Sequence, residues 1–258
     1  MTPARALRRV SVTVPPRRAE EARARMLELF PEGFEELDTP SGLELVAYTD
    51  PSGEERLWHV FGGARGADVD AGWEERWRAF HRPVRAGGLW IGPPWEEPPV
   101  GITAVVVDPG RAFGTGAHAT TRLCVELVSA LPRGSLLDVG CGSGVLAIAA
   151  AKLGFAPVHA VDDDPAAVEA AERNAAANGV RVAVSLLDAL SAPLPAAETA
   201  VANVTLDAVR RLALRLDCRR LVTSGYLVSS APRLVGFRPV RRVQEEGWAA
   251  DLWEAASE

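Results

Sequence analysis

The pattern of apolar and polar positions changes near residue 100 of this 258-residue chain. From residue 101 onward, short apolar runs alternate with longer amphipathic stretches, which predicts alternating strands and helices and therefore a mostly parallel α/β sheet. One of these helices has clear ends, because Asp164 and Pro165 suit its start and Gly179 its stop. The pattern predicts a doubly wound α/β domain over residues 101–258.

Residues 1–70 follow a different pattern, which predicts a small α+β domain. One helix-like stretch lies among strand-like runs, and proline and glycine residues mark the turns between them. In chain order, the expected elements are a strand at 8–14, a helix at 17–30 and strands at 33–37 and 42–50.

Residues 71–100, which join the two predicted domains, are rich in tryptophan and proline. Trp73, Trp77 and Phe80 recur at helical spacing and give a short helix one aromatic face. We interpret this face as packing that braces the two domains rather than as a cofactor-binding surface. The next stretch, GLWIGPPWEEPPVG, contains four prolines and is not expected to form a central strand.

Composition places the chain among ordinary globular proteins, with 48% apolar and 24% charged residues. No apolar run reaches the roughly 18 residues that span a bilayer, and no signal-peptide pattern follows the first arginines, so we expect a cytoplasmic protein without a membrane partner. Three widely spaced cysteines encode neither a disulfide framework nor a metal site. The net charge of −6 argues against direct nucleic-acid binding and favours a basic partner.

The segment LLDVGCGSGVLAIAAAKLG carries the strongest candidate for a binding site. Gly140, Gly142 and Gly144 fall where the first strand of the α/β domain turns into its helix, which is where doubly wound sheets bind ligands. Asp162 ends the next strand, 22 residues after Gly140, and a carboxylate there can accept both hydroxyl groups of an adenosine ribose. The pair predicts a nucleoside site. The alternative is a tight turn followed by acids that cap a helix.

Charge indicates which nucleoside cofactor this site would hold. A dinucleotide fold places a glycine where this chain has Val145, and Asp138 beside the turn would repel a pyrophosphate. The same acid suits the ammonium group of an amino-acid tail, whose carboxylate can take free N–H groups of the glycine turn. S-adenosylmethionine has that tail and a ribose but no phosphate, so it is the predicted cofactor.

Two further strand ends and one loop carry candidate side chains. Asp188, after the third strand, is a candidate acceptor for the adenine amino group, although a surface turn acid fits equally well. Asn203, at the end of the fourth strand, can orient a substrate nitrogen, and the alternative is a plain turn residue. The glycine-rich run VVVDPGRAFGTGAHATTRL, residues 105–123, is either an ordinary connection or a loop that clamps a ligand.

These segments resemble those of the ribosomal protein L11 methyltransferase (PrmA) family. DPGRAFGTGAHATT is similar to the family's DPGLAFGTGTHPTT, and VDDDP is similar to its IDIDP. LLDVGCGSGVLAIAAAKLG resembles its motif I, and WEERWRAFHRPV resembles its Trp-rich interdomain stretch. The resemblance runs from about residue 73 to residue 204.

The resemblance implies a fold and a set of cofactor contacts. The fold is a seven-stranded class I methyltransferase sheet with a small, ferredoxin-like N-terminal domain that recognises the substrate. The family's cofactor contacts fall on Thr121, Gly140, Asp162 and Asn203. Residues 112–121 are expected to fold over the methionine end of S-adenosylmethionine, and this segment contains Phe113, Gly114 and Thr115.

The implied function is methylation of amino groups on a basic ribosomal protein, ribosomal protein L11, by a monomeric enzyme that uses S-adenosylmethionine. Asn203 is the expected catalytic residue, because it can accept hydrogen bonds from the amine. His118 could take the amine proton, although a role in bracing the loop is the preferred interpretation.

Three departures from the family pattern keep the methyl acceptor open. NVTLDAV replaces the family's NILAGPL, the N-terminal domain looks truncated, and SSAPRLVGFRPV leaves little room for the usual helix. The alternatives are a methyltransferase with another protein or a small molecule as acceptor, and a non-catalytic module that binds S-adenosylmethionine. A nicotinamide-dependent oxidoreductase is a third alternative, which the missing glycine at 145 and the acid at 138 oppose.

Overall fold

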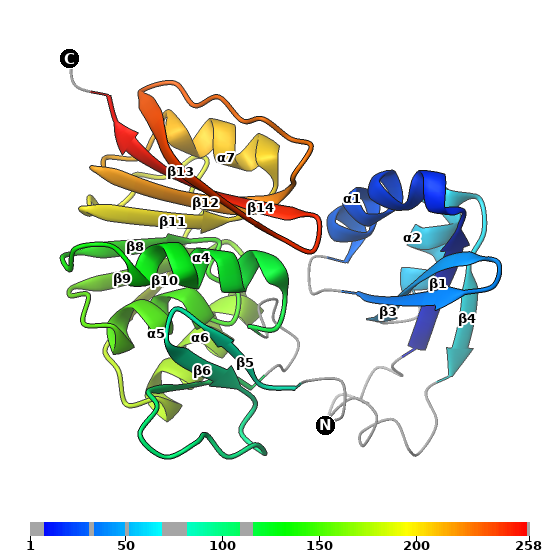
Figure 1. The fold of residues 1–258 in the computed structure, drawn as a ribbon, viewed down its shortest axis with the longest axis horizontal. Helices are drawn as coiled ribbons and strands as arrows, with labels where there is room; N and C mark the ends of the chain where they lie inside the picture. The colour runs from blue at the N-terminus through cyan, green and yellow to red at the C-terminus, as the bar shows by residue number, and fades with distance from the viewer. Residues whose placement is uncertain (1–7, 31–33, 50–51, 69–81, 109–115, 257–258) are drawn as a thin grey trace. The chain divides into compact units, whose positions relative to one another are not determined.

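The computed structural model describes residues 8–30, 34–49, 52–68, 82–108 and 116–256 (Figure 1). By its internal contacts the chain divides into two compact units, residues 1–80 and residues 81–258, and each is described here by itself. The division falls within the Trp- and Pro-rich stretch that the sequence predicts as the link. The predicted aromatic helix of Trp73, Trp77 and Phe80 lies outside the described residues.

The first unit contains a four-stranded antiparallel sheet and two α-helices. Its strands stand in the order β2-β3-β1-β4, and each neighbouring pair is antiparallel. The order of elements along the chain, βαββαβ, is that of a ferredoxin-like domain. The elements are β1 (Arg8–Val14), the 3-10 helix η1 (Pro16–Arg18), α1 (Ala19–Leu29), β2 (Glu35–Thr39), β3 (Gly42–Thr49), α2 (Ser52–Phe61) and β4 (Arg65–Asp68).

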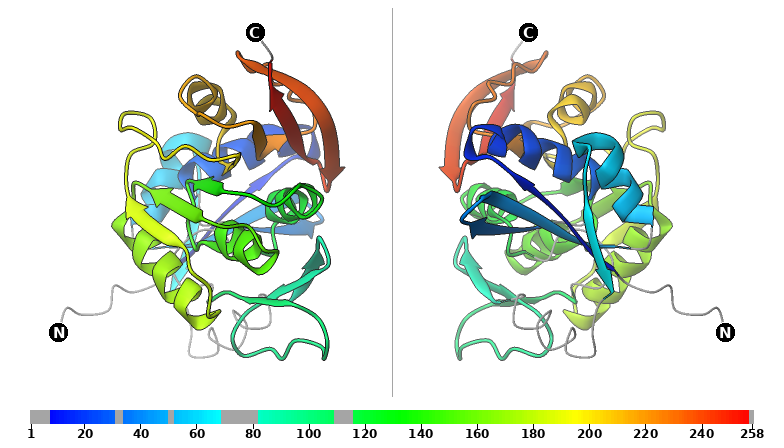
Figure 2. Two further views of the ribbon diagram at one scale, coloured as in Figure 1. Left: turned by 90° about the vertical axis from the view of Figure 1, so that its left-hand side faces the viewer. Right: turned by 90° about the vertical axis from the view of Figure 1, so that its right-hand side faces the viewer.

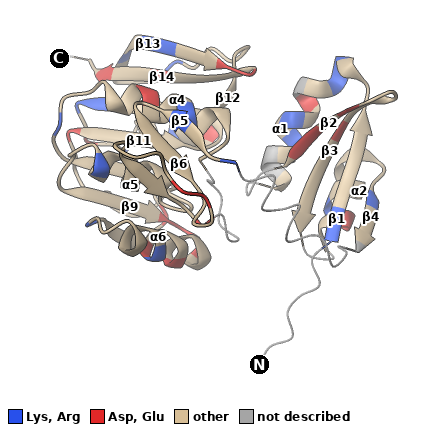
Figure 3. Cartoon of the chain, turned by 60° about the horizontal axis from the view of Figure 1, so that its bottom comes forward, with Lys and Arg blue, Asp and Glu red and all other residues tan. Residues whose placement is uncertain are grey.

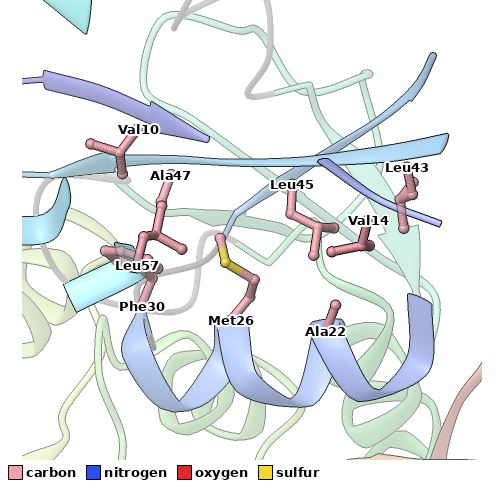
Figure 4. Packing of buried hydrophobic residues seen from close by; sticks show 9 residues of the cluster. All are labelled: Val10, Val14, Ala22, Met26, Phe30, Leu43, Leu45, Ala47 and Leu57. Carbon is pink, nitrogen blue, oxygen red and sulfur yellow. The ribbon is translucent and has the colours of Figure 1, made fainter. Parts of the chain in front are cut away.

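Both helices of this unit cover one face of the sheet and enclose an apolar core (Figure 4). Met26 of α1 and Leu57 of α2 have no exposed surface, and each such side chain contributes roughly 1.5–3 kcal/mol of burial free energy. Alternate residues of β1 and β3 and every fourth residue along α1 point into it. The buried members are Val10, Val14, Ala22, Met26, Phe30, Leu43, Leu45, Ala47 and Leu57.

Two expectations for this unit are corrected by the structure. The pattern after residue 50 predicted no further element, yet α2 and β4 are present, so none of the six elements of the ferredoxin-like pattern is missing and the domain is not truncated. The helix carries a helical pattern that the sequence analysis missed. Leu57 and Phe61 lie four positions apart and both pack in the core of this unit, whereas Trp58 between them is 59% exposed.

The second unit begins with a small three-stranded sheet of β5 (Val84–Ala86), β6 (Leu89–Gly92) and β7 (Ala104–Val106). β6 is the central strand, antiparallel to β5 and parallel to β7. The expectation that the proline-rich stretch forms no central strand is therefore wrong. The strand ends at Gly92, before the first proline of the stretch, and all four of its residues are buried.

The large sheet of the second unit has seven strands in the order β10-β9-β8-β11-β12-β14-β13 (Figures 1 and 2). The first five strands in that order are parallel, and β14 is antiparallel to both of its neighbours. The strands are β8 (Leu136–Val139), β9 (Val158–Asp162), β10 (Ala183–Leu186), β11 (Thr199–Asn203), β12 (Arg220–Leu227), β13 (Phe237–Glu245) and β14 (Trp248–Ala255).

Helices cover both faces of this sheet. Leu137 and Val139 of β8 pack in one cluster with Leu212, whereas Asp138, which points to the opposite face, contacts Ala147. α7 therefore lies on one face and α5 on the other. The helices are α4 (Ala119–Ser129), α5 (Val145–Lys152), α6 (Pro165–Ala177) and α7 (Leu206–Ala213).

The connection from β12 to β13, residues 228–236, contains turns but no helix, as the short SSAPRLVGFRPV segment predicted. Among the helices that the structure describes, none combines the length and the apolar character that crossing a bilayer requires.

Candidate functional site

A glycine turn joins β8 to α5 and forms the floor of the candidate site. Gly140, Gly142 and Gly144 all have positive φ, at 69°, 52° and 79°. A Cβ atom on Gly140 would lie 2.6 Å from a methyl group of Val204, and one on Gly144 would lie 2.9 Å from the Cβ of Ala171. Glycine is therefore required here both by backbone conformation and by close packing against the end of β11 and against α6.

Asp162, the last residue of β9, braces this turn. Its Oδ2 accepts a hydrogen bond from the Gly142 N–H at 2.8 Å, and its Oδ1 accepts one from the Asp164 N–H at 3.0 Å. A carboxylate has about four acceptor positions, so these two bonds orient the group and leave it able to accept more. The side chain lies directly beside the glycine turn, as its position at the end of the second parallel strand predicted.

Asp138 is the buried charge of the site. Its side chain is 1% exposed, and its Oδ2 accepts a hydrogen bond from the Ala147 N–H at 3.0 Å. Among the described residues, its Oδ1 has no hydrogen-bond partner. The pKa of Asp138 is raised to about 7, mainly by burial and in part by the neighbouring charge of Asp162, while the hydrogen bond from the Ala147 N–H acts to lower it. An unpaired carboxylate oxygen in this position suits a cationic ligand group.

Asn203, the last residue of β11, lies against the first turn of α4. Its Nδ2 is 3.2 Å from Thr120 Oγ1 and 3.5 Å from Thr121 Oγ1. Both threonines are 1% exposed. His118 is the N-cap of α4, and its ring meets the ring of Trp248 edge to face at 4.9 Å. The structure thus brings the predicted residues Thr121 and Asn203 together from segments 82 positions apart.

The remaining predicted residues have different outcomes. Phe113, Gly114 and Thr115 lie outside the described residues. Asp188 is exposed, and its two carboxylate oxygens accept hydrogen bonds from the Leu190 N–H and the Ser191 hydroxyl, both at 2.8 Å. These bonds lower the pKa of Asp188. Asp188 therefore has the environment of an acid in a surface turn, which was the alternative interpretation. Its contact with adenine stays a prediction.

One detail of the predicted ligand contacts is corrected. The glycine turn was expected to offer free N–H groups to a ligand carboxylate. In the structure, the N–H groups of Gly140 and Cys141 donate to the Val161 carbonyl, at 2.9 Å and 3.1 Å. The Gly142 N–H donates to Asp162, and the Gly144 N–H donates to the Cys141 carbonyl at 2.8 Å. The turn is closed by its own hydrogen bonds, so these four donors are already used.

Two asparagines that the sequence did not single out hold the strand that leads into the glycine-rich loop. Asn178 Oδ1 accepts from the Val106 N–H at 2.8 Å, and its Nδ2 donates to the Val106 carbonyl at 2.6 Å. Asn174 Oδ1 accepts from the Asp108 N–H at 3.1 Å. Both residues are buried, with Asn174 4% exposed and Asn178 9% exposed. Asn174 is the one polar residue among the buried alanines of α6, and a buried polar side chain usually has a hydrogen-bond partner. This pattern could have pointed to its role from the sequence.

The residues present fit S-adenosylmethionine at this end of the sheet. The unpaired Oδ1 of Asp138 would hold the ammonium group, and Asp162 would accept the ribose hydroxyls. The strand order, with β14 inserted antiparallel beside the edge strand, is that of a class I methyltransferase sheet. Within that class the chain belongs to the ribosomal protein L11 methyltransferase (PrmA) family, because the family model matches residues 44–233.

Known relatives agree with this family. A ribosomal protein L11 methyltransferase from Symbiobacterium thermophilum is 40% identical over 196 residues, which cover 70% of this chain and 64% of that protein. One from Legionella pneumophila is 38% identical over 198 residues, covering 70% and 68%. The crystal structure of a ribosomal protein L11 methylase from Lactobacillus delbrueckii subsp. bulgaricus matches 69% of this chain and 100% of that chain, with a TM-score of 0.61 and 29% identity. The chain spans about two thirds of the length of the two curated relatives.

Proposed function

We propose that this protein transfers a methyl group from S-adenosylmethionine to amino groups of ribosomal protein L11. Membership of the family supports the reaction class. The observation that carries the cofactor is Asp138, a buried carboxylate whose Oδ1 has no partner among the described residues. Burying an unpaired carboxylate costs folding free energy. A cationic ligand group, such as the ammonium group of S-adenosylmethionine, would offset this cost.

Methyl transfer of this kind asks the protein mainly to position the acceptor. When bound, S-adenosylmethionine supplies an electrophilic methyl group on a sulfonium, and the acceptor nitrogen must be held in line with the departing sulfur. A lysine amine must also be neutral to attack, and lowering its pKa from about 10.4 to about 7 corresponds to roughly 4.6 kcal/mol. Burial of the amine disfavours its charged form, and Asn203 is placed to accept a hydrogen bond from it.

Surface charge supports a basic protein as the acceptor. In the view of Figure 3, Lys and Arg are interspersed with Asp and Glu and do not form one basic stripe. The net charge of the chain is −6. An acidic enzyme attracts a basic ribosomal protein before assembly and repels bare RNA, so methylation is expected to slow as salt approaches about 0.15 M.

We assign recognition of this acceptor to the N-terminal domain. The residues of the candidate cofactor site all belong to the second unit, residues 81–258, which leaves the first unit for contacts with the rest of the acceptor. β2 is an edge strand of the small sheet, and its Asp38 is exposed. Asp38→Arg is expected to raise KM for ribosomal protein L11 and to leave the affinity for S-adenosylhomocysteine unchanged. Glu172→Arg, on the exposed side of α6, makes the same charge change as a matched control.

Mass spectrometry tests the proposed reaction. Purified ribosomal protein L11 is incubated with the protein and isotopically labelled S-adenosylmethionine, beside a whole-lysate sample and an Asn203→Ala control. Methylated amino groups on ribosomal protein L11, formed much more slowly but still measurably with Asn203→Ala, are the expected result. Label on another protein or a small molecule, with ribosomal protein L11 unmodified, would point to the altered NVTLDAV segment, which contains the start of α7. No label on any species in the lysate would indicate a binding module.

A further inference from the structure

His118 and Thr120 meet at the start of α4 in a way that fixes the protonation of the histidine ring. Nδ1 of His118 accepts the backbone N–H of Thr120 at 3.4 Å, as the N-cap of the helix. The same Nδ1 lies 2.8 Å from the hydroxyl oxygen of Thr120. A backbone N–H can only donate, so Nδ1 must carry a lone pair. The ring is therefore neutral, with its proton on Nε2.

This tautomer decides the direction of the Thr120 hydrogen bonds. Since Nδ1 has no proton to give, the Thr120 hydroxyl donates its single proton to the Nδ1 lone pair, which the longer bond from the backbone N–H shares. Toward Asn203 the hydroxyl then offers only lone pairs. The group of Asn203 that faces it, 3.2 Å away, must be the NH2 group. With Thr120 1% exposed, water does not compete for these bonds.

We infer that Thr120 is a positioning residue that, through neutral His118, fixes which end of the Asn203 amide is offered to the methyl acceptor. Nδ2 of Asn203 is committed to α4, which leaves Oδ1 as the end that accepts a hydrogen bond from the acceptor amine. If Nδ1 of His118 carried a proton, the Thr120 hydroxyl could donate to Asn203 instead, and the two amide orientations would no longer differ. This inference rests on the proposed function, because it assigns a role within the same site.

The surroundings of His118 hold it at this position. The Trp248 ring packs against it from β14. Arg122, one helical turn further along α4, donates to the Ala117 carbonyl and pairs with Glu245 at 3.0 Å and with Glu246 at 2.9 Å. The β13–β14 turn is thereby tied to the residue that precedes the cap. The start of α4 is held by the protein itself, as a positioning element requires.

Two Thr120 variants test the inference in the full chain. Thr120→Val removes the hydroxyl at nearly constant volume and is expected to lower kcat for ribosomal protein L11 roughly 3- to 10-fold, the value of one neutral hydrogen bond. The Kd for S-adenosylhomocysteine should stay within about twofold, and Thr120→Ser should restore kcat. Thr199→Val is the matched control, because Thr199 is fully buried at the other end of β11 and its hydroxyl has no hydrogen-bond partner among the described residues.

A double-mutant cycle separates positioning from a general structural effect. If Thr120 acts through Asn203, Thr120→Val should change nothing further in the Asn203→Ala background. Equal losses in both backgrounds, or a Thr120→Ser variant as slow as Thr120→Val, would overturn the inference.

Nuclear magnetic resonance keeps the inference testable even if no acceptor is methylated. In the protein bound to S-adenosylhomocysteine, the 15N shift of His118 Nδ1 should be that of an unprotonated nitrogen. The NH2 protons of Asn203 should exchange with water roughly tenfold faster in Thr120→Val. Both results without methylation by the wild-type protein would reject the proposed function and retain the positioning role. A protonated Nδ1, or unchanged exchange, would reject the positioning role whatever the activity.

Discussion

Replacing Asp138 by asparagine is expected to stabilise the protein without ligand and to weaken cofactor binding. The substitution keeps the shape of the side chain and an oxygen that accepts the Ala147 N–H. It removes a negative charge from a site where the side chain is 1% exposed and one oxygen lacks a partner among the described residues. Stability and binding should therefore change in opposite directions.

The size of the stability change follows from the pKa. Burial raises the pKa of Asp138 from 3.8 to about 7, so the folded state holds the proton over a pH range in which the unfolded state has lost it. The stabilisation is thus present in acid and is lost as pH rises from about 4 to about 7. Three pH units at about 1.4 kcal/mol each give about 4 kcal/mol, of which about 3 kcal/mol is lost above pH 5.

Urea denaturation of the wild type and Asp138→Asn at several pH values measures this effect. Other titrating groups cancel in the difference between the two proteins, which should widen in favour of Asp138→Asn by about 3 kcal/mol from pH 5 to pH 8. Calorimetry with S-adenosylhomocysteine at pH 8 should show affinity reduced roughly ten- to a hundredfold, the value of a charge-assisted hydrogen bond. A stability difference that does not vary with pH would refute the reasoning.

Three other predictions concern the same site. Asp162→Ala should weaken S-adenosylhomocysteine binding about tenfold or more, since hydrogen bonds to a charged acceptor are lost, and an unchanged calorimetric Kd would remove the ribose assignment. Gly140→Ala should lower the free energy of unfolding in urea by roughly 1–3 kcal/mol. Gly154→Ala, which shares the positive φ but has no atom within 4 Å of the added Cβ, should cost less. Amide hydrogen exchange over residues 110–121 should slow when ligand binds, and equal exchange would exclude a loop that closes over it.

The position of the polar side chains near the carboxyl ends of the parallel strands could be predicted from the topology of the sheet. Parallel strands end at one edge of a sheet, so Asp138, Asp162 and Asn203 had to approach one another once alternating strands and helices were identified. The glycine spacing was readable for the same reason, since only glycine suits the positive φ of the turn between β8 and α5. These features depend on local sequence and on one rule of topology.

Other parts of the site depend on contacts that sequence spacing does not encode. The bond between Thr120 and Asn203 joins residues 83 positions apart. Two of the four N–H groups of the glycine turn donate to the Val161 carbonyl on the neighbouring strand, and a third donates to Asp162. Each of these depends on how elements pack after they form.

The three polar side chains at the strand ends share one arrangement that explains why the site uses Asp and Asn. Oδ2 of Asp138 accepts the Ala147 N–H, and the carboxylate of Asp162 accepts the Gly142 N–H of the glycine turn. Nδ2 of Asn203 donates to the Thr120 hydroxyl in α4. Each internal bond fixes the rotation of a short side chain, and each group keeps further acceptor capacity. A serine side chain has a single polar atom, so the same oxygen would have to make the internal hydrogen bond and bind the ligand. Asp138 and Asn203 are each oriented by one polar atom and can bind with the other, whereas Asp162 is oriented by both oxygens and can bind through the lone pairs that remain. All three side chains are therefore oriented before any ligand arrives.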